Sequence, residues 1–202
     1  FKNATAALGE VVSLLAAGAD VLKELDESVA AVRGAAAQVD AGAASGVAFE
    51  AAKDDLNDLS KQLAAALKRI VTTDPRNVVL LNGAAKELAG VVPRMADAAG
   101  AAAAATQEAA LRGELRDSAQ RLVGDAGDVL AAARESAANP SSAAPLSGSP
   151  AFSGVRGAVA ALLDAAKRGA VGEIKLAEAL EIISAVTVDL DGAALYAAAG
   201  QL

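Results

Sequence analysis

Apolar residues recur at steps of three or four along nearly the whole chain, and this spacing limits what the chain can fold into. Residues at these steps share one face of an α-helix, whereas a half-buried strand alternates every second residue. Six runs follow the helical spacing, and turn-forming residues separate them. The runs cover approximately residues 3–39, 47–72, 74–100, 106–137, 152–168 and 173–199.

The side chains available for a core point to the same fold class. Apolar residues make up 54% of the chain but aromatic residues only 2%, so the core must consist of Ala, Leu, Val and Ile. Alanine has the highest helix propensity because it loses no side-chain entropy when a helix forms. We therefore predict an all-α bundle without β-sheet, in which small side chains let the helices approach closely.

Several residues mark the ends of the predicted helices. Asp74 followed by Pro75 is typical of an N-cap and a first helical position. Pro93 lies inside the third run, where we expect a kink or break. The segment Asn139–Pro150 holds three of the five prolines and predicts a loop at about residues 138–151. Gly169–Gly172 is expected to close the fifth helix.

We interpret the chain as one domain, residues 1–202. The proline-rich loop is not read as a domain linker, because the two helices after it could not form a core alone. Residues 43–202 form the core bundle in this prediction. The first helix, within residues 1–42, belongs either to this bundle or to a preceding one that shares it.

The residue inventory argues against catalysis. The chain has no Cys and no His, which removes thiolate nucleophiles, His-based metal sites and Ser-His pairs. The acidic pairs Asp54–Asp55 and Asp189/Asp191 are interpreted as solvated helix faces. No glycine cluster matches a dinucleotide or phosphate-binding motif. We predict a non-enzymatic protein without cofactor or metal.

Charge and hydropathy restrict the partners further. The net charge of −7 does not suit nucleic acid, which binds basic surfaces. No apolar run is long and uncharged enough to be a transmembrane segment. The absence of cysteine suits a reducing compartment, and we expect a cytoplasmic protein.

The closing segments carry a resemblance to a known family. Glu181–Leu202 (EIISAVTVDLDGAALYAAAGQL) resembles the last helix of the eleventh rod bundle of talin, the linker between integrin and actin. Val155–Gly169 is similar to the penultimate helix of that bundle without a gap. Upstream, Ser60–Val71 (SKQLAAALKRIV) is the most similar piece. About fifty residues match well, and the others follow the same order of helices.

The resemblance implies a more specific architecture and role. It implies an up-and-down bundle of five helices plus one N-terminal helix, placed between neighbouring rod domains in a cytoskeletal adhesion linker at the inner face of the plasma membrane. It also implies a surface for an integrin cytoplasmic tail on the last two helices. We place this surface on basic residues there: Arg156, Lys167, Arg168 and Lys175.

Talin rods also contain cryptic helices that bind vinculin, with the pattern LxxAAxxVAxxVxxLIxxA. Two runs approach this pattern and are predicted ligands of a vinculin-like protein. The fourth run departs from it at Gly124 and Gly127. Its matching residues are Leu115, Ala119, Leu122, Ala126, Val129, Leu130 and Ala133, and those of the second run are Leu56, Leu59, Leu63, Leu67 and Ile70.

Two other classes of function remain open from the sequence. A vinculin-like, catenin-like or endocytic-adaptor-like scaffold domain without integrin binding would have the same helical pattern. An enzyme or cofactor-binding bundle would need a buried polar cluster, and no helix seam supplies one.

Overall fold

The computed structural model describes residues 2–36, 39, 47–141 and 146–170, and the side chains among them from residue 18 onward. Four long α-helices have both ends within this part: α1 (Lys2–Gly34), α3 (Phe49–Thr72), α4 (Val78–Ala105) and α5 (Ala109–Ala138). A short 3-10 turn, η1 (Leu146–Gly148), precedes a further helix over residues 150–170. The described residues contain no strand, and the prediction of an all-α bundle is confirmed.

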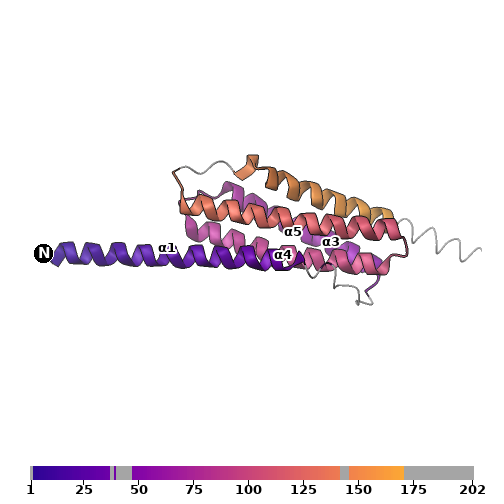
Figure 1. Cartoon of the computed structure of the whole chain (residues 1–202), viewed down its shortest axis with the longest axis horizontal. Coiled ribbons are helices and arrows are strands. Elements are labelled where there is room, and N and C mark those ends of the chain that lie inside the picture. The colour runs from indigo at the N-terminus through magenta and orange to yellow at the C-terminus, as the bar shows by residue number, and fades with distance from the viewer. Residues whose placement is uncertain (1, 37–38, 40–46, 142–145, 171–202) are drawn as a thin grey trace, which may run out of the picture.

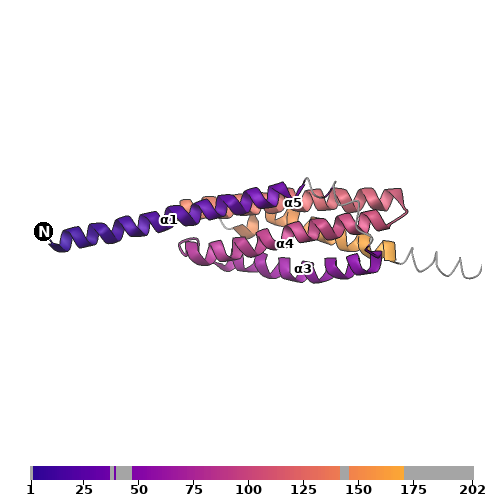
Figure 2. The same ribbon diagram turned by 90° about the horizontal axis from the view of Figure 1, so that it is seen from below.

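The helices lie along one common axis, with α4 antiparallel to both α3 and α5, and α1 antiparallel to α5 (Figures 1 and 2). Side-chain pairs fix these directions. Gln62 and Arg69 of α3 meet Arg94 and Glu87 of α4 in reverse order along the chain. α1 packs on α4 and α5, and its N-terminal part extends beyond the other helices (Figure 2).

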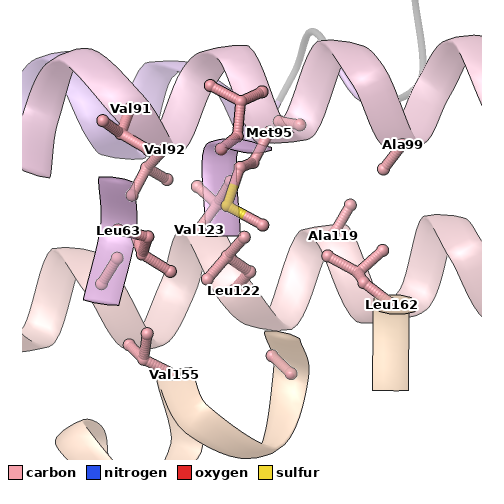
Figure 3. Close-up of a cluster of buried hydrophobic side chains, with 14 of the residues drawn as sticks. Leu63, Val91, Val92, Met95, Ala99, Ala119, Leu122, Val123, Val155 and Leu162 are labelled. Atoms are coloured by element: carbon pink, nitrogen blue, oxygen red, sulfur yellow. The ribbon is translucent and has the colours of Figure 1, made fainter. Parts of the chain in front are cut away.

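The core lies where four helices converge (Figure 3). Leu63 of α3, Met95 of α4, Leu122 of α5 and Val155 of the 150–170 helix are each at most 1% exposed. Small residues fill the space between them: Ala96, Ala99, Ala119 and Ala126 are fully buried. Alanine-lined seams allow the close helix approach that the composition predicted.

The second half of α1 contributes to this core. Leu25 and Val32 are fully buried, and Ser28 is 6% exposed with its hydroxyl donating to the Glu24 carbonyl oxygen at 3.0 Å. Whether α1 is also shared with a preceding bundle stays a prediction.

The start of α4 differs from the sequence-based expectation. Asn77, not Asp74, is the N-cap, and its side-chain oxygen accepts a hydrogen bond from the Leu80 backbone N–H at 3.2 Å. Asp74 instead accepts from the Arg76 backbone N–H at 2.9 Å and forms the turn before the helix. Both residues have the short polar side chains that caps and turns need. Asp74 comes first in the chain and stabilises the turn, and Asn77 caps the helix.

The helices are not interrupted at Pro93 or at Gly169. α4 runs through Pro93 without interruption and ends only at Ala105. Gly169 lies within the 150–170 helix and is buried, rather than closing the helix. The rest of the predicted closing segment, the sixth predicted helix and residues 142–145 of the predicted loop lie outside the described residues.

Candidate functional site

The stripe of α5 that resembles a vinculin ligand is fully inside the bundle. All seven residues named from the sequence are at most 1% exposed. They lie at helical steps of three or four and therefore form one continuous face. This face packs against α1 and α4 along the helix, and Leu122 and Ala119 point into the cluster drawn in Figure 3. No ligand could reach these side chains without displacement of a helix.

Opening this face is costly. Burial of each Leu or Val side chain contributes about 1.5–3 kcal/mol, so the four large residues of the stripe together account for roughly 6–12 kcal/mol of gross burial energy. The alanines contribute less because they have little surface to bury. Most of the burial energy of this face therefore comes from Leu115, Leu122, Val129 and Leu130, each at most 1% exposed.

The second candidate helix, α3, is buried to a similar degree. Leu56, Leu63 and Ile70 are at most 1% exposed, and Leu59 and Leu67 are 5% exposed. α3 packs on α4, and its first residue Phe49 contacts the end of the 150–170 helix. Both candidate stripes are thus core, and the structure separates them onto different helices.

Ion pairs connect α5 to α1. Arg134 Nε donates to Asp26 Oδ1 of α1 at 3.1 Å, and Asp128 Oδ1 accepts from Arg33 Nη2 of α1 at 3.2 Å. These pairs are solvent-exposed, so water and salt weaken them. They position α1 on α5 but do not replace the apolar core as the source of stability.

A further ion pair joins α5 to the 150–170 helix, where Arg168 pairs with Glu114, the residue before Leu115. The hydrogen bond from Arg168 lowers the pKa of the Glu114 carboxyl and raises the pKa of the Arg168 guanidinium. Arg168 Nε also lies 3.3 Å from Asp164 Oδ2. Its charge is therefore balanced within the bundle.

The predicted basic surface is only partly assembled. Arg156 and Lys167 are both exposed on the 150–170 helix. Eleven residues make three helical turns, so these two cations lie on one face, about 16 Å apart along the axis. Arg168 is turned toward α5 by its pairing with Glu114. Lys175 lies outside the described residues.

The two glycines of the α5 stripe have different surroundings. A Cβ on Gly124 of α5 would meet open space, whereas one on Gly127 would lie 3.1 Å from Arg33 Cγ. Gly127 thus permits the close approach of α1, while Gly124 only weakens the helix. The sequence could not separate these two roles, since both residues are single glycines in the same run.

Among the described residues, no group of three or more Asp or Glu side chains is placed to hold a metal ion. Asp54 and Asp55 are exposed on α3, and Asp189 and Asp191 lie outside this part. Of the described helices, none is long and apolar enough to cross a membrane. The partners Glu114 and Asp128 were not identified from the sequence, because isolated carboxylates carry no spacing signal.

Comparison with known proteins extends the resemblance to the whole chain. No protein-family model matches the chain. The chain is 29% identical over 204 residues to Talin-A of Dictyostelium discoideum and 25% identical over 203 residues to Talin-B of the same organism. Each alignment covers 99% of this chain but 8% of the relative. The chain is therefore similar to a segment of talins along its whole length.

Proposed function

We propose that this chain is a non-enzymatic helical scaffold module of a talin-like cytoskeletal adhesion protein, with α5 as a cryptic helix for a vinculin-like partner. The observation that carries the proposal is the complete burial of the α5 stripe in a chain similar to talins from end to end. We also propose that the module corresponds to the eleventh rod bundle, because its closing segments resemble the last two helices of that bundle.

The proposed mechanism is a coupling between opening and binding. In the closed bundle the stripe is inaccessible, so the apparent affinity equals the affinity of released α5 multiplied by the fraction of molecules in which α5 is released. A partner groove that accepts the apolar face would cover the side chains that leave the core. Pulling on the ends of the bundle would raise the released fraction and hence the binding.

Separate titrations of the free α5 peptide and of the intact chain with a vinculin head domain test this mechanism. We expect a peptide of residues 109–138 to bind a vinculin head domain in the micromolar range or tighter, and the intact chain to bind far more weakly until it is heated toward unfolding. A peptide in which Leu122 and Leu130 are replaced by Asp is the matched control. Absence of binding by the native peptide at about 100 µM would reject α5 as the ligand, and the α3 peptide would be tested next.

We further propose that Arg156 and Lys167 form part of a surface for the acidic membrane-proximal segment of an integrin tail. Their exposure and common face support an electrostatic contact, to which Lys175 would add. In this proposal the module acts at adhesion sites on the cytoplasmic face of the plasma membrane, next to other rod domains.

The alternative function is a scaffold domain of the vinculin, catenin or endocytic-adaptor kind without integrin binding. The closed bundle described above is equally compatible with this alternative function. The two functions differ in the basic face, because only the first requires Arg156 and Lys167 to bind an acidic tail.

A further inference from the structure

The contact between α1 and α4 contains a polar cluster that belongs neither to the cryptic stripes nor to the basic face. Asn82 of α4 is 7% exposed, and its Nδ2 donates a hydrogen bond to Glu24 Oε2 of α1. Lys86, one turn further along α4, donates to the same oxygen at 2.9 Å. Asn82 Oδ1 is buried and accepts no hydrogen bond within the part of the chain that the structure describes. The contact therefore uses the Asn82 amide as a donor.

Asn82 is followed by Gly83, and the sequence contains no other Asn–Gly pair. In such a pair the glycine nitrogen can attack the side-chain amide carbon of the asparagine, because glycine has no Cβ to hinder the approach. A bond forms between Gly83 N and Asn82 Cγ, the Cγ–Nδ2 bond breaks, and the amide nitrogen leaves as ammonia. Water then opens the resulting ring to aspartate or isoaspartate. An amide thus becomes a carboxylate by hydrolysis, without oxidation or reduction.

The closed bundle opposes this reaction. Gly83 lies within the α-helix Val78–Ala105, where each backbone N–H donates to the carbonyl oxygen four residues earlier. Attack requires the Gly83 nitrogen to leave this hydrogen bond and the backbone of Asn82 to leave its helical conformation. The Asn82 amide must also separate from Glu24. Both changes require α4 to unwind locally and α1 to move away.

The start of α4, which must unwind, has few contacts with the core. Val79 and Leu80 are 69% and 61% exposed, and Val78 is half-buried. Leu81 is the first residue of α4 that is fully buried. Gly83 adds no side-chain contact, and a Cβ at this position would meet open space. Segments with few buried apolar contacts open locally at a lower free energy than the rest of a domain.

We propose that Asn82 is a deamidation site that reacts when the α1–α4 contact opens, and that its products keep this contact from closing again. An aspartate there places a second carboxylate opposite Glu24, where the amide had donated, and the two like charges repel each other. An isoaspartate adds a methylene to the main chain and interrupts the hydrogen bonds of α4. Either product adds one negative charge to a net charge of −7. Deamidation thereby records that the bundle has opened, whichever partner binds.

The first experiment follows deamidation of the full 202-residue chain by peptide mapping and mass spectrometry, in native buffer and in guanidinium chloride. The rate in the folded chain equals the rate in the open form multiplied by the open fraction, so Asn82 should react at least about tenfold faster in denaturant. Gly83→Ala is the chemical control, because its Cβ fits the fold but hinders the attack. It should slow the reaction in denaturant. Equal rates in the folded and the unfolded chain would overturn the proposal.

The second experiment identifies the contact that controls the reaction. Val32 of α1 and Val155 of the 150–170 helix are both 0% exposed. Val32→Ala and Val155→Ala therefore remove the same atoms from the core, but only the first loosens α1. In native buffer Val32→Ala should speed deamidation at Asn82 about threefold or more relative to Val155→Ala. Equal acceleration by the two variants would mean that the reaction follows global unfolding, and it would reject control by α1.

The third experiment tests the effect of the product through Asn82→Asp. Hydrogen exchange of the described α1 amides should be at least about fivefold faster than in the native chain, while exchange in α3 changes little. Glu24→Gln/Asn82→Asp should restore slow exchange in α1, because the glutamine amide can donate to the new carboxylate. This double variant also shows whether a poorly folded single variant fails through charge. Native exchange in Asn82→Asp, or no recovery in the double variant, would reject the effect of the product.

Discussion

Gly169 of the 150–170 helix lies against the ring of Phe49 in α3. A Cβ at Gly169 would come within 2.8 Å of Phe49 Cε1 and of Leu111 Cδ2 of α5. Phe49 is 2% exposed and Leu111 3%. One missing side chain thus lets three helices meet at this end of the bundle, and a side chain added there should be poorly tolerated.

Replacement of Gly169 by Val should lower the free energy of unfolding by about 1–3 kcal/mol, because the added atoms must displace a buried ring. Gly157 lies in the same helix, and a Cβ there meets open space. Gly157→Val is therefore the control, and it should change stability by less than about 0.5 kcal/mol. Urea unfolding measures both. Equal stability of the two variants would contradict the close packing at Gly169.

The second prediction concerns the loss of a charged contact in acid. Glu24 of α1 accepts hydrogen bonds from Lys86, at 2.9 Å, and from Asn82 of α4. The hydrogen bond from Lys86, followed by that from Asn82, lowers the pKa of Glu24. A lowered pKa in the folded state means that this contribution is present above the ordinary glutamate value of about 4.3 and is lost as the pH falls through the folded-state value.

We therefore expect Glu24→Gln to be less stable than the native chain at about pH 6–7, and the difference to shrink toward about pH 3. The control is Glu27→Gln, since Glu27 lies 4.0 Å from Lys23 of its own helix and both side chains are largely exposed. The urea concentration at the unfolding midpoint, measured for the native chain and both variants across this pH range, tests the prediction. A difference that does not depend on pH would show that Glu24 acts through packing rather than charge.

The third prediction separates a cryptic ligand from a purely structural helix. Gly124→Ala should favour the helical form of α5 by about 1 kcal/mol, because a Cβ there meets open space. The free peptide should then bind a vinculin head domain about fivefold more tightly. The intact chain should keep nearly the same affinity, since its closed and partner-bound states gain equally.

Calorimetric titrations of peptide and intact chain, each with Gly or Ala at position 124, give the four affinities. A gain of the same size in the intact chain would mean that α5 is not helical in the unbound state of the intact chain. Gly127→Ala is unsuitable for this purpose because Arg33 Cγ would lie 3.1 Å from the new Cβ.

The fourth prediction concerns the basic face. Arg156→Glu/Lys167→Glu should weaken binding to an acidic integrin-tail peptide, more at low than at high salt, and leave the thermal transition nearly unchanged. Arg168→Glu should also lower the Tm, because it places a carboxylate next to Glu114 and Asp164. Fluorescence anisotropy at two salt concentrations measures binding. Undiminished affinity of the double variant would remove this face from the proposed function.

Much of the architecture could be predicted from the sequence. The apolar stripe from Phe49 to Ile70 is buried as its spacing indicated, since helical periodicity is local and survives any arrangement of neighbours. The same holds for the stripe from Leu111 to Ala133. The orientation of Arg168 could not be predicted in this way, because the basic residues of the fifth run were grouped by sequence proximity. Arg168 turns toward α5, and no pattern within its own helix could reveal Glu114 as its partner.

The sequence by itself determined that the chain is helical and which face of each helix is apolar, because propensity and periodicity depend on residues only a few positions apart. The tertiary structure decided what depends on distant neighbours. It alone shows that Gly169 is a contact point rather than a helix end, that Gly124 and Gly127 differ, and that Val79 and Leu80 stay exposed while Leu81 is buried. The physical reason is that close approach, pairing and exposure are set by which helix packs on which side.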